Sequence, residues 1–384
     1  MTMTDGDGDY GPAPRRRGMR EGYTTGACAT AAAKAATLAL LTGAPVAQVT
    51  IHLPTGRDVT FTLSRCEIGA DAARCGVIKD AGDDPDVTHG AEIQATVSFT
   101  DAPGVTLAGG VGVGAVTRPG LGLEVGGPAI NPVPRRMITE AVLEALAGAD
   151  RGAQVEIAVP NGAELAKRTL NGRLGIVGGL SILGTTGIVR PYSTASWRAS
   201  VLQAVDVAAA NGLRHIALST GGRTERYAAA LLPDLPEMAF VEMGEFTGAA
   251  LKRAAARRIE RVTLAGMVGK FSKIARGHMM THVAGNQVEP TFLADLAAAA
   301  GAAQDLVTAI AAANTARHAQ ELAQAAGCHG FFSLVVDGVV AQCAAVVDQR
   351  LSVDAVLFDF DGTALAVSAA LAEAVAAREA RRAG

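Results

Sequence analysis

The chain has 384 residues, of which 49% are hydrophobic and only 4% aromatic, and a formal net charge of -3. This length allows two domains with separate cores, and the near-neutral charge argues against a nucleic-acid-binding surface. Polar residues interrupt every apolar stretch before it reaches about 18 residues, so we expect no membrane span. The five cysteines lack CxxC spacing, which indicates reduced thiols and no structural zinc site. We therefore expect a cytoplasmic protein.

The first half of the chain predicts an α+β domain over residues 19–192. Residues 1–18 combine Asp, Gly, Pro and an arginine run, which is typical of a disordered leader. Strands outnumber helices in the remainder of this half. In chain order we expect a Thr24- and Thr25-capped helix to about Leu41, a hairpin of residues 46–53 and 57–63, strands at 72–80 and 91–100 around an acidic loop, a helix over 134–147 and a strand at 154–160.

After residue 193 helices and strands alternate, which predicts a parallel sheet covered by helices, that is, a Rossmann-like α/β domain over residues 193–327. Residues 328–384 are expected to return to strands and one last helix that complete the fold. The expected elements are a helix to 210, strand 214–219, helix 220–232, strand 238–241, helix 246–256, strand 261–265 and alanine-rich helices within 290–326.

Two glycine-rich passages, 109–136 and 171–191, carry the most unusual composition. The second contains six glycines, which suit neither a helix nor a packed strand and indicate close approach of the backbone to a ligand or to another backbone. Basic residues lie in or beside both passages, where they suit a small molecule rich in carboxylates. The alternative is that they are unrelated arginines exposed to solvent. They are Arg118, Arg135, Arg136, Lys167, Arg168, Arg173 and Arg190.

The carboxyl ends of the predicted parallel strands are the expected ligand edge of the second domain. Residues 219–225 (STGGRTE) indicate a strand, a glycine turn and a helix, and amides at such a helix start suit a carboxylate or phosphate. An acid after the next strand suits the two hydroxyls of a ribose, so we expect an adenosine-containing cofactor. The candidate residues are Gly221, Gly222, Glu225, Glu242, Glu245, Gly266 and Lys270.

Three familiar nucleotide or phosphate motifs are present only in part. The dinucleotide pattern at 110–115 runs into Arg118-Pro119-Gly120, which prevents the helix it needs, and the P-loop-like 266–270 is followed by Phe271 instead of Ser or Thr. Asp359–Thr363 (DFDGT) resembles the first motif of haloacid-dehalogenase phosphatases. Too few residues follow it for the rest of that fold, so a turn after a strand is the preferred interpretation.

The acidic loop contains several potential metal ligands, but Gly82 and Pro85 favour a turn whose carboxylates cap backbone amides. His278 and His282 lie four residues apart without a third ligand, so we expect a polar site there and no zinc. We predict no protein-bound metal. The loop residues concerned are Asp80, Asp83, Asp84, Asp86 and His89.

Several long segments carry a resemblance to one family. They are 24–28 (TTGAC), 79–90 (KDAGDDPDVTHG), 112–121 (GVGAVTRPGL), 129–135 (AINPVPR), 160–167 (PNGAELAK) and 269–277 (GKFSKIARG), together with His282. Through them the chain closely resembles the CbiD family of cobalt-precorrin-5B C1-methyltransferases from Arg20 to about Ala326. It departs from the family at 283–290 (VAGNQVEP), where a more charged Asp-Gly-Arg type of sequence is expected.

The resemblance implies that S-adenosylmethionine donates a methyl group to ring carbon C-1 of a cobalt-containing tetrapyrrole, giving cobalt-precorrin-6A in the anaerobic cobalamin pathway. The cobalt then belongs to the substrate. A sulfonium donor has a good leaving group, so the enzyme must mainly align the reactants and exclude water. A proton must leave the macrocycle, and Asp80, Asp84 and His89 are the candidate bases. The candidate substrate-binding residues are Thr24, Thr25, Arg118, Asn131, Arg135, Arg136, Asn171 and Arg190.

On this interpretation the first domain binds the tetrapyrrole, the second binds S-adenosylmethionine, and the active site lies between them. Nucleic acid and membrane are not expected as partners, and a homodimer stays open. Two rival functions remain at this point: a non-catalytic tetrapyrrole carrier, and a phosphatase that uses Asp359 and Asp361.

Overall fold

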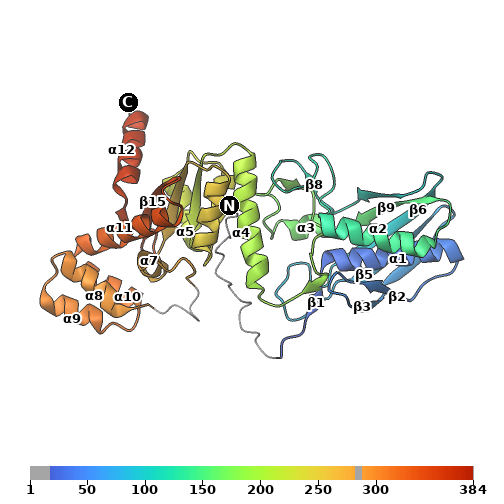
Figure 1. Ribbon diagram of the computed structural model, residues 1–384, viewed down its shortest axis with the longest axis horizontal. Coiled ribbons are helices and arrows are strands. Elements are labelled where there is room, and N and C mark those ends of the chain that lie inside the picture. Colours follow the sequence, from blue (N-terminus) through green and yellow to red (C-terminus); the bar gives the residue numbers. More distant parts are fainter. Residues whose placement is uncertain (1–17, 282–287, 384) are drawn as a thin grey trace, which may run out of the picture. The chain divides into compact units, whose positions relative to one another are not determined.

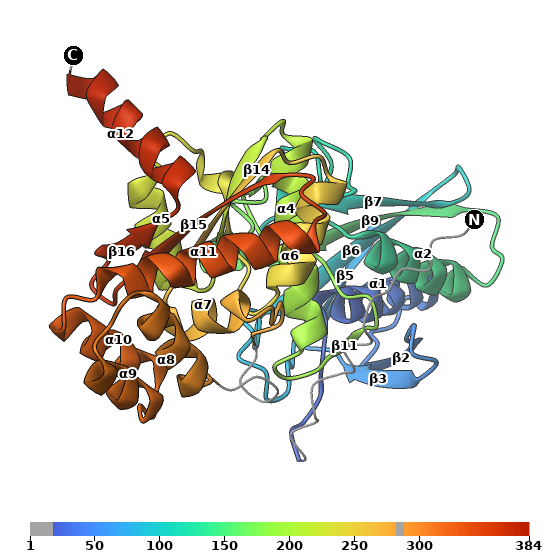
Figure 2. The same cartoon turned by 60° about the vertical axis from the view of Figure 1, so that its left-hand side comes forward.

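The computed structural model describes residues 18–281 and 288–383 (Figures 1 and 2). It divides between Ala195 and Ser196 into two compact units. The predicted leader lies almost wholly outside the described residues, as do His282 and most of the departing segment 283–290.

The first unit is built on a five-stranded sheet in the order β4-β5-β6-β9-β7, antiparallel except for the β7–β9 pair. Helices α1 and α2 lie side by side, and α1 packs against β5 and β6 (Figure 1). The elements are β1 Gly22–Tyr23, α1 Thr25–Thr42, β2 Gln48–His52, β3 Asp58–Thr62, β4 Arg65–Ile68, β5 Ala72–Ile78, β6 Glu92–Thr100, β7 Val105–Gly109, β8 Ala115–Val116, α2 Pro132–Leu146, β9 Gly152–Ala158, α3 Gly162–Ala166, β10 Ile176–Val177 and β11 Ile188–Val189.

Helix α1 begins and ends where its local sequence predicts. The Thr24 hydroxyl accepts a hydrogen bond from the Ala27 amide at 3.2 Å, and Gly43 ends the helix in the left-handed conformation with φ 67°. Alanines fill most of its buried face, which lets the helix approach its neighbours closely. At Gly26 even a Cβ would lie 2.7 Å from Pro134 Cγ of α2.

The two glycine-rich passages form one layer of loops. Strand β8 pairs with β10, and bridges join Val113 to Leu180 and Ile130 to Ile182. A Cβ on Gly179 would lie 2.2 Å from the Gly112 carbonyl oxygen, so these two backbones touch. The glycines therefore bring backbone against backbone, one of the two outcomes that their density predicted.

The second unit contains the sheet β13-β12-β14-β15-β16, in which the first four strands are parallel and β16 is antiparallel. The expected parallel, helix-covered sheet is therefore present with one antiparallel edge strand, and the chain has a mixed α/β fold. The elements are α4 Thr194–Ala210, β12 His215–Ser219, α5 Gly222–Leu231, the 3-10 helix η1 Glu237–Ala239, β13 Phe240–Glu242, α6 Thr247–Ala256, β14 Arg261–Gly266, α7 Val268–Ala275, α8 Pro290–Ala299, α9 Gln304–Ala311, α10 Ala316–Ala325, α11 His329–Val346, β15 Ser352–Phe358, β16 Ala364–Val367 and α12 Ala369–Ala383.

Three α-helices, the short α3 together with α7 and α11, were not predicted from the sequence. Helix α7 follows β14 directly, in a segment for which the sequence predicted no element, and α11 occupies a region where strands were expected. By length and composition α11 could cross a membrane. In the fold it packs against α7 and β15 and buries Phe331, Phe332 and Val335, so the core of this unit accounts for its apolar residues.

Candidate functional site

The residues predicted to bind a cofactor gather at one edge of the parallel sheet. Strand β12 is the neighbour of both β13 and β14, and all three run in the same direction, so their carboxyl ends lie together. Gly221, Gly222 and Glu225 follow β12, Glu242 ends β13, Glu245 precedes α6, Gly266 ends β14, and Lys270 lies near the start of α7.

Lys270 connects the loops at this edge. Its ammonium group donates hydrogen bonds to the carbonyl oxygens of Thr220 and, at 3.3 Å, of Gly244. Burial lowers the pKa of Lys270, although the charges of Glu245 and Glu242 act in the opposite direction. Lys270 therefore holds the loop after β12 to the loop after β13.

Two buried hydroxyls at the same edge lack a partner. Ser219 ends β12 and Thr247 begins α6; both are fully buried, and neither hydroxyl has a hydrogen-bond partner in the described part of the chain. Such groups are rare in folded proteins because each costs free energy. The Glu242 carboxylate lies over the glycine turn, since a Cβ on Gly222 would be 3.3 Å from its Oε2. The edge thus offers hydroxyls, amides and a carboxylate to a polar ligand.

The single tryptophan of the chain borders this edge. A Cβ on Gly244 would lie 2.3 Å from an indole carbon of Trp197, and the indole meets the Phe246 ring edge-on at 5.4 Å. Trp197 is 42% exposed. Sequence reasoning missed it because its segment predicted only a helix, and nothing local shows which loop its ring contacts.

Several of the predicted substrate-binding residues instead form hydrogen bonds that hold the glycine-rich layer together. The Thr25 hydroxyl accepts a hydrogen bond from the Leu183 amide at 2.9 Å, and the Asn171 amide donates to the Gly179 carbonyl oxygen at 3.0 Å. Asn171 is buried. Thr24 caps α1. These side chains fix the loops on which a ligand would rest.

The next two predicted residues lie where α2 begins. The Asn131 carbonyl oxygen accepts a hydrogen bond from the Arg135 amide, and the Asn131 amide donates to the Ile182 carbonyl oxygen at 2.9 Å. The Arg135 guanidinium donates to the carbonyl oxygens of Ile130 and Pro128 at 2.9 and 3.3 Å. Both residues therefore shape the loop before α2.

Three predicted arginines lie closer to solvent. Arg136 and Arg190 keep side-chain exposures of 61% and 57%, with only loose ion pairs to Glu140 at 3.9 Å and Glu21 at 3.3 Å. Arg118 is half-buried and packs across Gly175. Arg136 and Arg190 are therefore the predicted substrate-binding cations that are most open to an anionic ligand.

The glycine-rich layer also exposes apolar side chains, including Val111, which is 72% exposed. A loop layer that exposes both apolar side chains and arginines suits a ligand with a flat apolar body and charged substituents. The further exposed apolar residues of these passages are Val125, Val177 and Leu183.

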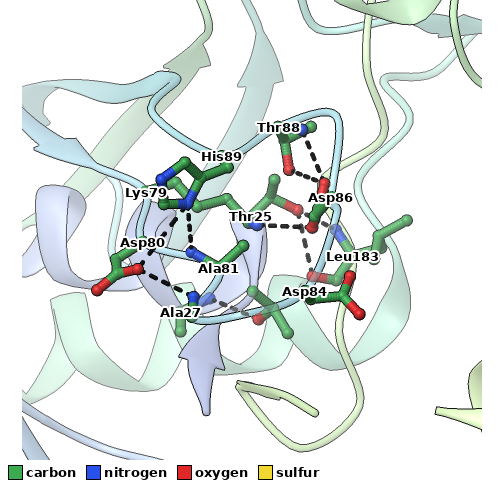
Figure 3. Close-up of polar contacts among 12 residues, drawn as sticks. Thr25, Ala27, Lys79, Asp80, Ala81, Asp84, Asp86, Thr88, His89 and Leu183 are labelled. Carbon is green, nitrogen blue, oxygen red and sulfur yellow. Dashed lines mark hydrogen bonds and ion pairs between the residues drawn. The ribbon is translucent and has the colours of Figure 1, made fainter. Parts of the chain in front are cut away.

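The acidic loop is held by contacts within it (Figure 3) and by contacts to Arg20 and Tyr192. Both carboxylate oxygens of Asp80 accept from the Arg20 guanidinium, and this hydrogen bonding lowers the pKa of Asp80 to about 2, with help from the Gly82 amide. His89 Nδ1 accepts from the Ala81 amide at 3.1 Å. Asp84 accepts from the Tyr192 amide at 2.9 Å. The three candidate bases thus have structural partners, and their catalytic role stays a prediction.

Beneath this loop lies a buried ion pair that sequence reasoning did not identify. Lys79 is only 1% exposed, and its ammonium donates to Asp86 at 2.7 Å. Asp86 also accepts from the Thr88 amide and hydroxyl at 2.7 and 2.6 Å. Burial acts to raise the pKa of Asp86, but the bonds from Lys79 and Thr88 outweigh it and hold that pKa below its usual value.

Two other predicted features can be located. Asp359 accepts hydrogen bonds from Gln320 and Gln324 at 2.7 and 3.0 Å, and Asp361 accepts from the Thr363 amide, so the turn preferred by the sequence is confirmed. Within residues 18–281 and 288–383, no three His, Cys, Asp or Glu side chains converge as metal ligands do.

Known proteins match the chain over nearly its whole length. The CbiD family model matches residues 13–191, and that of the CbiD C-terminal domain matches residues 280–369. The cobalt-precorrin-5B C(1)-methyltransferase of Salinispora arenicola is 55% identical over 351 residues, which cover 91% of this chain and 92% of the relative. That of Geobacillus kaustophilus is 52% identical over 352 residues, 91% of this chain and 95% of the relative.

Among solved structures, a cobalamin biosynthesis protein (cbiD) from Archaeoglobus fulgidus is 26% identical, with a TM-score of 0.37. The match covers 80% of this chain and 85% of that one. The extent and identity of the sequence matches decide the assignment: this chain belongs to the CbiD family.

Proposed function

We propose that the protein is a cobalt-precorrin-5B C1-methyltransferase, which transfers a methyl group from S-adenosylmethionine to C-1 of the macrocycle in the cytoplasmic, anaerobic route to cobalamin. The observation that carries this proposal is an identity of 55% to a relative of that name across 91% of the chain. Similarity of this extent includes both the glycine-rich loops and the parallel sheet.

We propose the carboxyl edge of β12, β13 and β14 as the site of S-adenosylmethionine, the position at which Rossmann-like domains bind nucleotides. The amides of the Gly221–Gly222 turn suit the methionine carboxylate, and the Glu242 carboxylate suits the ribose hydroxyls. The unpartnered hydroxyls of Ser219 and Thr247 support a polar ligand at this edge.

For the macrocycle we propose the glycine-rich layer of residues 19–192. Arg136 and Arg190 would pair with its carboxylates, while the exposed apolar side chains of the same layer would contact its ring. Thr24, Thr25, Asn131, Arg135 and Asn171 would act through the loops that they brace. Residues 193–327 would then bind the donor, and residues 328–384 contribute β15 and β16 to the sheet beneath it.

The reaction depends mainly on the alignment of the macrocycle carbon, the methyl group and the sulfur atom. The C-1 carbon forms a bond to the methyl carbon as the bond from that carbon to sulfur breaks, the sulfur leaves as a neutral thioether, and a proton leaves the macrocycle. Asp80 is a poor candidate base, because a carboxylate with a pKa of about 2 holds protons poorly. Asp84 and His89 remain the proposed bases.

Mass spectrometry of cobalt-precorrin-5B after incubation with the enzyme and methyl-labelled S-adenosylmethionine tests the function. The expected product carries one added labelled methyl group. A protein that binds the pigment and the donor and transfers no label would instead be a tetrapyrrole carrier.

A further inference from the structure

Two cysteines face each other across neighbouring strands. The register of β4 and β5 pairs Cys66 with Cys75, and the Gly69 amide donates to the Ala72 carbonyl oxygen at the turn between the strands. Antiparallel strands alternate between bonded and non-bonded pairs, and counting from this turn makes Cys66 and Cys75 a non-bonded pair, in which side chains approach most closely. Their sulfur atoms are 3.2 Å apart.

The two thiols differ in their surroundings. Cys75 is fully buried, and burial together with the hydrogen bond to Cys66 raises its pKa. Cys66 is half-buried at the margin of the core and lies on β4, the edge strand of the sheet, so it is the more accessible of the two thiols. The Val46 amide donates to Cys66 Sγ at 3.3 Å and helps to hold this sulfur opposite Cys75.

We propose that Cys66 and Cys75 form an oxidisable dithiol site, at which a hydroperoxide produces a reversible disulfide across β4 and β5. Cα atoms of a non-bonded antiparallel pair are about 4.5 Å apart, within the range that a disulfide spans, so rotation of the side chains suffices. Among the described residues no other two cysteine sulfurs lie within hydrogen-bonding distance of each other.

The chemistry balances in two steps. The accessible Cys66 sulfur attacks the peroxide, the oxygen–oxygen bond breaks, and Cys66 becomes a sulfenic acid while one water is released from hydrogen peroxide. The Cys75 thiol then displaces the second oxygen as water, and the sulfur–sulfur bond forms. A low-molecular-weight thiol reverses the reaction by exchange. The disulfide ties the edge strand β4 to β5, which leads directly to Lys79 and the acidic loop.

The experiment uses the full-length native protein, exposed to hydrogen peroxide, alkylated at its remaining thiols and digested with trypsin without reduction. Cleavage after Arg65, Arg74 and Lys79 separates Cys66 and Cys75 into the peptides 66–74 and 75–79. The expected result is a disulfide-linked pair of these peptides, which dithiothreitol separates, while three of the five thiols stay alkylated.

Variants make the result decisive. Cys66→Ser should abolish the linked pair, whereas Cys328→Ser, which changes a half-buried thiol of the other unit, should leave it intact. In Cys75→Ala the Cys66 sulfenic acid should persist and react with dimedone, since its resolving thiol is gone. Oxidation of Cys66 to the sulfinic acid in the wild type with Cys75 still alkylated, or a cross-link of Cys66 to another cysteine, would overturn the proposal.

Discussion

The ion pair of Lys79 and Asp86 anchors the acidic loop by charge instead of by apolar contact. Lys79 has a side-chain exposure of 1% and Asp86 of 26%, so the pair is only weakly screened by water. The pair also fixes the conformation of the turn, because the Asp86 carboxylate accepts hydrogen bonds from both Lys79 and Thr88. A neutral residue at position 79 would leave a carboxylate without its counter-ion in a largely dry place.

We therefore expect Lys79→Met to lower the free energy of unfolding by about 3 kcal/mol, near the lower end for a broken buried pair because Asp86 keeps some contact with water. Urea denaturation measures the loss. Lys167→Met is the matched control, since Lys167 pairs with Glu164 at 2.7 Å but is 69% exposed, and we expect less than about 1 kcal/mol there. If adding Asp86→Asn to Lys79→Met restored no stability, an unpaired charge would not be the cause.

Asp80 makes the stability depend on pH in a defined window. Its pKa falls from 3.8 to about 2 in the folded state, chiefly through the hydrogen bonds from Arg20. A lowered carboxyl pKa stabilises the fold fully above 3.8, and this contribution is lost as the pH falls through about 2.

The stability advantage of the wild type over Asp80→Asn should accordingly be constant at neutral pH and shrink at acid pH. Urea midpoints measured between neutral pH and pH 2 test this. A difference that stays constant throughout would show that the Arg20–Asp80 contact contributes no proton linkage.

Lys270 is the residue on which the proposed donor site most depends, because it holds the loops after β12 and β13 together. We expect Lys270→Met to weaken the binding of S-adenosylhomocysteine by roughly tenfold, because the loops that form the site lose about one charge-assisted hydrogen bond that holds them in place. Fluorescence of the single tryptophan, Trp197, gives the titration signal. Calorimetry of the same variant separates a loss of affinity from a loss of signal.

At the scale of elements, the glycine-rich layer depends on close backbone contact. Gly179 is buried, and its Cβ would lie 2.2 Å from the Gly112 carbonyl oxygen, whereas a Cβ on Gly172 meets nothing within 4 Å. Neither residue has a left-handed φ. Comparison of these two positions therefore isolates the steric effect.

Gly179→Ala should destabilise the first unit by about 1–3 kcal/mol, as overpacking does, because backbone cannot move aside as a side chain can. Gly172→Ala should change stability by no more than about 0.5 kcal/mol. Thermal or urea unfolding of both variants measures the difference. Equal effects of the two changes would mean that the layer is not closely packed.

At the scale of the whole molecule, the two proposed ligands belong to different units, so binding of each should be separable by mutation. Arg136→Ala and Arg190→Ala should each weaken binding of the macrocycle by roughly tenfold, since each removes one charged contact to a carboxylate. Affinity for S-adenosylhomocysteine should stay nearly unchanged. Calorimetric titration with both ligands is the measurement.

Arg74→Ala serves as the control, because Arg74 lies exposed on β5 outside the glycine-rich layer, and it should affect neither titration. An equal loss of both affinities in Arg136→Ala or Arg190→Ala would argue against assigning the two ligands to separate units.

The sequence alone determined the features that depend on near neighbours along the chain. These include the Thr24 cap of α1, the β2–β3 hairpin and the turn at Asp359–Thr363. Long glycine-specific segments also indicated the family. Caps, alternation and turns act over a few residues, so their signal is present in the local sequence.

Only the tertiary structure decided the partners of polar and sulfur side chains. Thr25, a predicted ligand-binding residue, accepts a hydrogen bond from Leu183, 158 residues away, and so stabilises a loop. The Asp80 carboxylate is hydrogen-bonded to Arg20, 60 residues away. Helix α11 was missed because its sequence is apolar almost without interruption, so no helical periodicity separates it from a buried strand. Its packing against α7 and β15 is a tertiary contact. Such contacts depend on packing between distant segments, and a pattern read over a short window does not contain them.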